Sequence, residues 1–191
     1  MNSWRREIRW KKKYELIEDT LVLFYEADEK LKIIRSPFSF SDEGTTRKKK
    51  ENETPEETQL LNSSYVLYER WEKEKETFLK LQTIKFRFIA IFGKEYLRPF
   101  DEVRIIVNEI FLANNRLNDR YWRDQGKKQM ADEQFQKHLK GMNEAEAKIW
   151  DMQDENDVIR IRIHKAIEQI ESLYNKVLGK KYHNIPSSLK E

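Results

Sequence analysis

Residues that break helices are scarce in this chain and fall in a few narrow gaps. Among 191 residues there are five glycines and four prolines, and all but one lie between long segments in which apolar residues recur at intervals of three and four. That spacing is the period of an α-helix packed on one side. It predicts an all-α fold, an up-down bundle of four to five helices. The breakers are Pro37, Gly44, Pro55, Gly93, Pro99, Gly126, Gly141, Gly179 and Pro186, with Gly141 the one inside a segment.

The helix boundaries follow from these residues. Thr54-Pro55-Glu56-Glu57 predicts a helix start, with a hydroxyl at the N-cap, proline at the first position and glutamate three residues after the cap. The helix that starts there should end at Gly93. It should form a long antiparallel hairpin with the helix before it, because a rod of that length needs a partner. The expected helices are 4–34, 55–92, 99–125, 128–151 and 158–179, the last two being separate or one kinked helix.

We expect one bundle domain over residues 4–179. Within it, residues 38–53 lose the helical pattern to Ser, Thr, Gly and charged residues, which predicts a flexible loop. The basic run 47–50 inside this loop is expected to be solvated. Residues 180–191 are expected to form a frayed tail. Asn114 lies on the apolar stripe of the third helix, where a buried amide could fix helix register.

Composition limits the classes of function. The 37 Lys and Arg residues against 34 Asp and Glu leave a formal net charge of +3, which is too balanced to indicate nucleic acid. The absence of cysteine excludes disulfides and thiolate chemistry and fits a reducing, cytoplasmic compartment. The longest uncharged run is the eleven residues 58–68, whereas a membrane span needs about 20 apolar residues.

No motif for metal, cofactor or catalysis is recognisable. A di-iron bundle needs Glu three residues before His, but the residues three before His138, His164 and His183 are not acidic. There is no P-loop and no glycine-rich dinucleotide turn. We therefore expect no cofactor, no metal site and no enzyme activity. An enzyme with a pocket between helices is kept as an alternative that requires a concave site with convergent polar groups.

The N-terminal segment 1–13, continuous with the first helix, carries the best functional signal. Its net charge is +5, from six cations against Glu7, and it contains two tryptophans. Cations beside tryptophan suit the cytoplasmic edge of a bilayer with anionic lipids. The candidate membrane or phosphate contacts are Trp4, Arg5, Arg6, Arg9, Trp10, Lys11, Lys12 and Lys13.

Two other interpretations of this segment are open. It could be the solvated first turns of a helix whose tryptophans pack on neighbours. It could instead bind nucleic acid, since cations with interleaved aromatics also suit phosphates and bases. The cluster Arg116, Arg120, Tyr121, Trp122 and Arg123 could extend such a surface, but arginines flanking a helix end are the simpler explanation.

Several stretches resemble a family of uncharacterised bacterial proteins, over residues 4–125 above all. Members of that family carry one N-terminal membrane helix just before the Trp-Arg-Arg segment, followed by a cytosolic helical domain. The family offers no catalytic residues. The matching stretches are Trp4-Arg5-Arg6-Glu7, Leu23-Phe24-Tyr25-Glu26-Ala27, Ile34-Arg35-Ser36-Pro37-Phe38, Glu53-Thr54-Pro55-Glu56, Phe92-Gly93-Lys94, Arg98-Pro99-Phe100-Asp101-Glu102, Ile106-Val107-Asn108-Glu109-Ile110 and Tyr121-Trp122.

The resemblance favours a juxtamembrane role for residues 1–13. The chain itself has no anchor before Trp4, so either Met1 is an introduced start or this member is soluble. The expected function is a non-catalytic scaffold or protein-interaction domain at the cytoplasmic face of a bacterial inner membrane. Its expected partners are an anionic membrane surface or an upstream transmembrane helix, and an unknown protein; nucleic acid is less favoured. Self-association is a further expectation, because Ile84 and Ile91 lie off the main apolar stripe of their helix.

Overall fold

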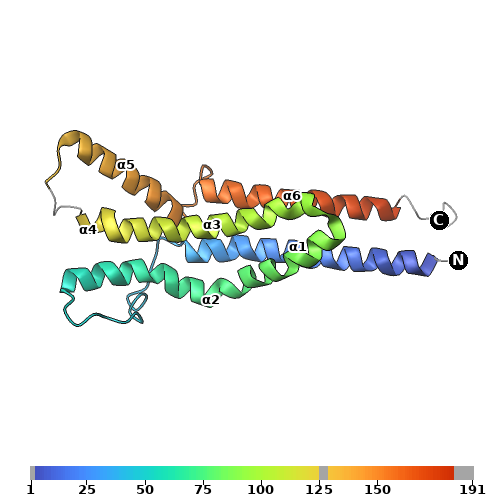
Figure 1. The fold of residues 1–191 in the computed structure, drawn as a ribbon, viewed down its shortest axis with the longest axis horizontal. Coiled ribbons are helices and arrows are strands. Elements are labelled where there is room, and N and C mark those ends of the chain that lie inside the picture. The colour runs from blue at the N-terminus through green and yellow to red at the C-terminus, as the bar shows by residue number, and fades with distance from the viewer. Residues whose placement is uncertain (1–2, 125–128, 183–191) are drawn as a thin grey trace.

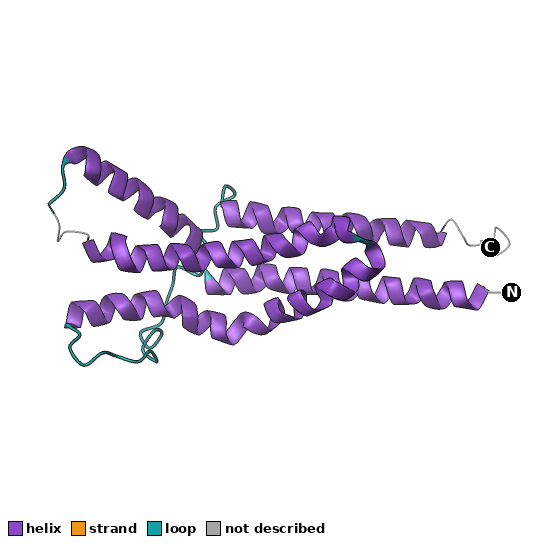
Figure 2. Ribbon diagram, in the orientation of Figure 1, coloured by secondary structure: helices purple, strands orange, loops and turns teal. Residues whose placement is uncertain are grey.

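The computed structural model describes residues 3–124 and 129–182, and these ranges contain helices and loops but no strand (Figure 2). The predicted all-α fold is confirmed. A single 3-10 turn, Lys94–Tyr96, connects the second and third helices, and a π-helical turn, Leu117–Tyr121, follows the third. The helices are α1 Ser3–Ile34, α2 Pro55–Phe92, α3 Leu97–Arg116, the short α4 Trp122–Asp124, α5 Asp132–Ile149 and α6 Val158–Tyr182.

Four helices run up and down along one rod. α1 and α2 form the predicted antiparallel hairpin, α3 returns beside α2, and α6 runs antiparallel to both α1 and α3 (Figure 1). The N-terminal end of α1 and the C-terminal end of α6 therefore lie at the same end of the rod. α5 packs against α3 at the opposite end, where α1 is absent. Four long helices, α1, α2, α3 and α6, therefore lie side by side over only part of the length of the rod.

Three phenylalanines join α1, α2 and α3 in the core. The ring of Phe100 lies 5.2 Å from that of Phe24 and 5.3 Å from that of Phe88, measured between centroids. All three side chains are fully buried. Burial of one such ring stabilises the folded state by roughly 1.5–3 kcal/mol, so this cluster holds the three helices together near the α2–α3 connection.

The second helix begins and ends as its sequence predicts. The Thr54 hydroxyl accepts a hydrogen bond from the Glu57 amide at 3.2 Å, and the Glu57 carboxylate accepts one from the Thr54 amide at 3.2 Å. Pro55 occupies the first helical position, where no amide hydrogen is needed. At the other end Gly93 adopts a φ of 109°, which a side chain would strain. The cap and the glycine confirm both bounds of α2.

Arg35 connects three segments that are distant in sequence. It follows the last residue of α1 and is 1% exposed. Its guanidinium donates to the carbonyls of Ala147, Lys148 and Trp150 at 2.8–3.0 Å, and to the Asp157 carboxylate at 2.7 Å. The three carbonyls belong to the C-terminal end of α5, which otherwise has no donors. One side chain therefore caps α5 and anchors the start of α6.

The loop between α1 and α2 is held against α2 by two further buried arginines. Arg70 donates to the carbonyls of Ser36 and Phe38 and to the Glu43 carboxylate. Arg47, with a side chain 8% exposed, forms a bidentate pair with Glu53. The expectation that the run 47–50 is solvated is therefore wrong for Arg47, because the short loop brings its guanidinium onto a carboxylate.

The third helix departs from its predicted bounds at both ends. It begins at Leu97, two residues before Pro99, because the first amides of a helix need no acceptor and proline is tolerated there. It leaves α-helical geometry after Arg116, where the π-helical turn begins. Asn114 is buried and donates to the Ser64 carbonyl at 3.0 Å, so it joins α3 to α2 as an amide in the apolar stripe should.

The last two long helices are separate, and both differ from their expected ranges. α5 starts at Asp132 rather than 128, with Asp132 and Glu133 in its first turn as the helix dipole favours, and Lys128 lies outside the described residues. α5 ends at Ile149 rather than at 151, and the Arg35 guanidinium donates hydrogen bonds to the last carbonyls of this helix. α6 continues past Gly179 to Tyr182, since glycine permits a stop without imposing one. The expected tail is therefore helical over 180–182, and 183–191 lie outside the described residues.

Candidate functional site

The predicted basic segment forms one half of a two-helix projection, here called the tip. The N-terminal part of α1 and the C-terminal part of α6 extend together beyond the α2–α3 connection (Figure 1). The hydroxyls of Tyr14 and Tyr174 lie 3.0 Å apart across this pair, and the Trp10 indole lies 3.5 Å from the Val177 carbonyl, to which its N–H donates. The tip is thus an antiparallel pair of helices held together by aromatic side chains.

The six cations that α1 contributes to the tip all face solvent. Lys11 has an ion pair, with Glu15 at 3.8 Å, and the Arg9 side chain donates to the Arg5 carbonyl at 3.3 Å. For the other five cations no ion pair occurs within the described part of the chain. An unpaired, exposed cation keeps its electrostatic field for an approaching anion. The five α1 cations without an ion pair are Arg5, Arg6, Arg9, Lys12 and Lys13.

The two tryptophans of the segment have different roles. Trp10 is half-buried and stacks on Tyr14 with 5.2 Å between ring centroids, so it packs the tip together. Trp4 is 59% exposed, and Ile8, one turn further along the same face of α1, is 45% exposed. The Arg5 guanidinium lies 5.4 Å from the Trp4 ring centroid. The tip therefore presents an apolar strip beside a cationic face.

The second arginine cluster does not extend this surface. Arg120 and Arg123 lie at and beyond the end of α3, whereas the tip lies at the opposite end of the rod (Figure 1). Arg120 rests over the Tyr121 ring at 5.9 Å. A single nucleic-acid surface built from both clusters is therefore excluded by the fold.

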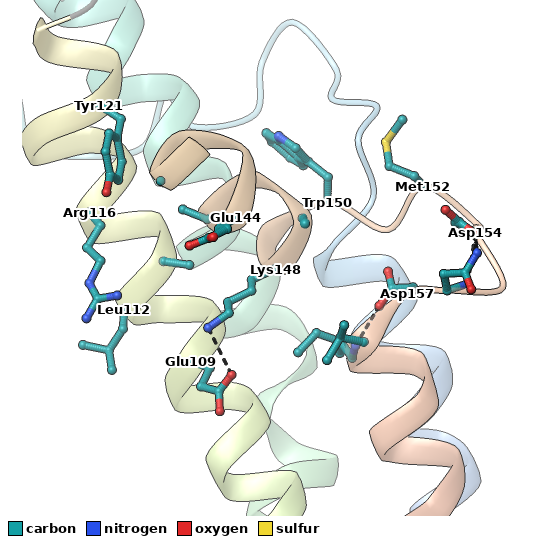
Figure 3. A pocket seen from close by; sticks show the side chains of 17 residues that line it. Glu109, Leu112, Arg116, Tyr121, Glu144, Lys148, Trp150, Met152, Asp154 and Asp157 are labelled. Carbon is teal, nitrogen blue, oxygen red and sulfur yellow. Dashed lines mark hydrogen bonds and ion pairs between the residues drawn. The ribbon is translucent and has the colours of Figure 1, made fainter. Parts of the chain in front are cut away.

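A cavity of about 570 Å³ lies between α3, α5, the segment 150–157 and the first turn of α6 (Figure 3). We call it the α3–α5 cavity. Its lining contains no Ser, Thr, Cys or His side chain, so it lacks a nucleophile–base pair of the serine or cysteine type. It does meet the geometric requirement of the enzyme alternative, a concave site with polar groups. The polar and aromatic side chains around it include Glu109, Arg116, Tyr121, Glu144, Lys148, Trp150, Asp154 and Asp157.

One wall of the cavity carries a charge network. Glu109 accepts from Lys148 at 3.3 Å and from Arg162 at 3.0 Å, and Arg162 also pairs with Glu102. Burial raises the pKa of Glu109, but the hydrogen bonds and charges of Arg162 and Lys148 outweigh it, so the net shift is downward. Glu109 therefore stays ionised and serves to join α3, α5 and α6.

The π-helical turn and Gly141 shape the other wall. A Cβ on Gly141 would lie 2.3 Å from the Tyr121 hydroxyl, so only glycine lets the Tyr121 ring lie against α5. The Tyr121 ring also contacts His138 edge-on at 5.2 Å. His138 is buried and its Nε2 atom has no hydrogen-bond partner within the described residues. The one glycine that interrupts a predicted helix is thus explained by a close aromatic contact.

Sequence reasoning missed the α3–α5 cavity. Leu112, Met152 and Val158 lie in three different elements, so no periodic pattern groups them. Ile84 and Ile91, the residues on which the expectation of self-association was based, are partly buried and pack against the core. Apolar side chains that α1 and α2 leave exposed away from the tip include Val22, Ile33, Leu79 and Phe86. Self-association stays a prediction, which light scattering tests.

Comparison with protein-family models, with curated proteins and with solved structures gives no match. The resemblance stated from the sequence therefore stays a prediction. No helix within 3–124 or 129–182 combines the length and apolar character that crossing a bilayer requires. In the same ranges, no three His, Asp or Glu side chains are grouped so that they could hold a metal ion.

Proposed function

We propose that the protein is a non-catalytic helical scaffold that binds the anionic cytoplasmic surface of a bacterial membrane through its tip. The observation that carries this proposal is the exposed Trp4–Ile8 strip beside six solvent-facing cations at the extreme end of the rod. Such a combination suits the interface, where tryptophan lies among headgroups and cations attract anionic lipid.

The position of the tip defines how the molecule would sit on the membrane. Because the cations lie at one end of a rod, binding through them directs the long axis away from the surface (Figure 1). The loop between α1 and α2, with Phe38 and Phe40 each about four-fifths exposed (83% and 79%), then faces the cell interior. Exposed aromatic side chains of this kind suit contact with a protein partner. This arrangement is that of an interaction module held at a membrane.

Liposome co-sedimentation tests the proposal. The protein should bind vesicles containing about 30% phosphatidylserine or phosphatidylglycerol and should not bind purely zwitterionic vesicles. Changing Arg5, Arg6 and Arg9 to Glu should weaken binding by on the order of 100-fold, since each cation near the surface contributes about a fivefold factor. A matched control changes Arg116, Arg120 and Arg123 to Glu, with the same change in net charge at the other end of the rod. Equal binding to both vesicle types, or equal loss in both variants, contradicts the proposal.

The alternative partner of the same cations is nucleic acid. It predicts retardation of DNA or RNA in a gel, with an affinity that falls steeply between 50 and 200 mM salt, as about six phosphate contacts would require. The fold offers little support beyond the cations themselves, because among the tip side chains that the structure describes Trp4 is the one exposed aromatic. Retardation that the Arg5, Arg6 and Arg9 variant abolishes, without vesicle binding, would replace the membrane proposal.

A further inference from the structure

A shallow groove of about 550 Å³ lies between α1 and α2. Its apolar lining is Val22 and Leu23 of α1 with Leu79 and Ile84 of α2. Val22 is 49% exposed and Leu79 is 57% exposed, and Phe86, two turns beyond Leu79 on the same side of α2, is 74% exposed. A single exposed apolar side chain is ordinary, but three beside one groove are typical of a surface that contacts another protein.

Acidic residues surround the groove on α1. Residues 14–29 contain six carboxylates and no Lys, Arg or His. Glu18, Asp19 and Glu26 are exposed, and none of them forms an ion pair within the described part of the chain. This stretch of α1, here called the acidic block, is therefore a negative surface.

Cations occupy the other side of the groove. Residues 79–94, here called the basic block, contain four cations and no Asp or Glu. Two of the four, Lys80 and Lys85, pair with carboxylates of the same chain at 2.9 and 2.7 Å. Arg87 and Lys94 are exposed and have no ion pair among the residues that the structure describes. The basic block therefore keeps positive charge that the fold does not use.

The two blocks lie side by side at the same height along the rod. Lys30 of α1 pairs with Glu74 of α2 at 2.7 Å, and the two helices run antiparallel. Arg87, thirteen residues beyond Glu74, therefore lies level with Glu18 and Asp19 of α1, to within about one residue. Each molecule thus presents a negative and a positive surface beside each other, with the apolar groove between them. We call this combined surface the α1–α2 face.

The α1–α2 face is complementary to a second copy of itself. A two-fold axis parallel to the rod places α1 of one copy against α2 of the other at the same height, so each acidic block faces a basic block. Val22 then lies against the exposed side of α2 around Leu79. A two-fold axis across the groove, perpendicular to the rod, places α1 against α1 and α2 against α2, so like charges face each other. The charge pattern therefore favours the parallel pair.

We propose that the protein forms a homodimer through the α1–α2 face, with the two rods parallel. Val22, Leu79 and the groove form the apolar centre of the interface, and the opposed blocks form its charged rim. Both tips then lie at the same end of the dimer, where salt screens the repulsion between their exposed cations. The dimer does not depend on membrane binding, but it offers a membrane two tips at once.

Sedimentation velocity without lipid tests the dimer. The full chain should change from monomer to dimer between about 5 and 200 µM in about 100 mM NaCl. Because the opposed charges are exposed, about 500 mM NaCl should weaken the dimer at least fivefold. A monomer at every concentration, or a dimer that salt does not weaken, overturns the proposal.

Two variants with reversed charge test which surfaces meet. The acidic variant changes Lys80, Arg87 and Lys94 to Glu, and the basic variant changes Glu15, Glu18 and Asp19 to Lys. Each alone should dimerise at least tenfold more weakly than the original chain, because like charges then face each other. An equal mixture should form a heterodimer, since each altered block faces a block of opposite charge. Unchanged dimerisation of either variant, or a mixture of folded variants that stays monomeric, overturns the pairing.

A milder change keeps the test valid if either charge-reversed variant loses its helix content by circular dichroism. Glu18→Gln with Asp19→Asn removes two negative charges without placing a cation beside α2. It should weaken the dimer about threefold, the effect of losing exposed ion pairs. Unchanged dimerisation of this variant counts against the proposal as well.

Charge reversal at the tip is the matched control. Changing Arg5, Arg6 and Arg9 to Glu alters the net charge by the same amount as the acidic variant, but it should keep the dimer while vesicle binding is lost. Loss of the dimer in this variant indicates an antiparallel pairing of tips with acidic blocks and overturns the proposal. Failure of the dimer and failure of membrane binding are therefore distinguishable.

The direction of the rods can be measured because the chain contains no cysteine. A spin label on Arg5→Cys, at the tip, should lie within about 30 Å of the label on the other copy, since packed helices are about 8–10 Å apart. An antiparallel dimer centred on the groove separates the two labels by roughly 50 Å at 1.5 Å per residue. Pulsed electron paramagnetic resonance distinguishes these distances, and the longer one refutes the parallel arrangement.

Discussion

At the tip, six lysines and arginines of α1 extend into solvent, whereas the side chains of Arg35, Arg47 and Arg70, which lie away from the tip, are buried among carbonyls and carboxylates. The two regions use the same kind of side chain for different purposes. A buried guanidinium is stable only where acceptors match its donors, and each of these three arginines donates to a carboxylate and to at least one backbone carbonyl. An exposed guanidinium without partners contributes little to stability and remains available for binding. The comparison separates residues that hold the fold from those that can contact another molecule.

The largest effect is expected at Arg35. Arg35→Met leaves the buried Asp157 carboxylate without its countercharge, and it leaves the carbonyls of Ala147, Lys148 and Trp150 without this donor. The free energy of unfolding should therefore fall by about 3–5 kcal/mol. Arg5→Met at the tip should change it by less than about 0.5 kcal/mol. Urea unfolding followed by circular dichroism measures both. A loss below about 1 kcal/mol for Arg35→Met would contradict the structural role assigned to the buried arginines. The double variant with Asp157→Leu should recover part of the loss.

The two tryptophans of the tip provide the next test. Trp10→Ala removes a half-buried ring that stacks on Tyr14, so it should lower the free energy of unfolding by about 1–2 kcal/mol. Trp4→Ala should leave stability within about 0.5 kcal/mol of the original while weakening vesicle binding. Thermal unfolding and co-sedimentation of the two variants give the two readouts. If Trp4→Ala proves the more destabilising of the two, the roles assigned to them are reversed.

The third test compares two glycines, Gly141, which lies against the Tyr121 ring, and Gly179, which lies in open space. Gly141→Ala puts a methyl group onto the Tyr121 hydroxyl, so the ring must move, at a cost of about 1–3 kcal/mol that exceeds the gain in helix propensity. Gly179→Ala meets no atom within 4 Å and should stabilise the protein by up to about 1 kcal/mol. The two changes are chemically identical, and their shifts in Tm should have opposite signs. The same sign for both would show that Tyr121 does not constrain α5.

Smaller effects are expected from pH, in opposite directions for the two regions. The hydrogen bond with Tyr174, burial and the Glu18 charge raise the pKa of Tyr14 from 10.0 to about 12. Because the folded-state value is the higher one, this stabilisation is complete below pH 10 and is lost as pH rises from 10 to 12. The hydrogen bond with Glu171 raises the pKa of Tyr25 to about 12 as well. Tyrosinate absorbance at 295 nm should therefore show a late component from both side chains, which Tyr14→Phe reduces and Tyr14→Phe with Tyr25→Phe removes.

The loop between α1 and α2 should respond at acid pH instead. The hydrogen bonds from Arg47 and from the Lys50 amide lower the pKa of Glu53 from 4.5 to about 2. Its contribution to stability is therefore complete above pH 4.5 and is lost as pH falls towards 2. Glu53→Gln should be less stable than the original protein at pH 6, and the difference should disappear near pH 2. A constant difference across this range would show that the ion pair with Arg47 contributes nothing.

The helices could be predicted from the sequence because their signals are local. Thr54, Pro55, Glu57 and Gly93 act within one turn of the helix ends, and both bounds of α2 follow from them. The end of α5 could not be predicted, because the groups that terminate it come from Arg35, more than a hundred residues earlier in the chain. Helix boundaries set by distant partners leave no trace in local composition.

The candidate sites differ in the same way, because one is formed by neighbouring residues of the sequence and the other by residues that are distant in it. The basic tip is contiguous in sequence, so its residues were identified together, although the different roles of Trp4 and Trp10 required the position of α6. The α3–α5 cavity is assembled from residues 109–159, and Leu112 and Val158 resemble ordinary members of an amphipathic helix. Charge gives no clue either, since Glu109 and Glu144 differ only in whether a cation from another helix reaches them.

The reach of Arg35 also has a consequence for the nascent chain. Its acceptor Asp157 lies 122 residues further on, and at ribosomal rates of about 5–20 residues per second that distance takes roughly 6–24 seconds to synthesise. During that interval residues 147–157, which hold the hydrogen-bond partners of Arg35, have not been synthesised. The guanidinium at the end of α1 therefore stays in water while the α1–α2 hairpin forms. Release of the last third of the chain, rather than formation of the first hairpin, should therefore be the event that commits the molecule to its native state.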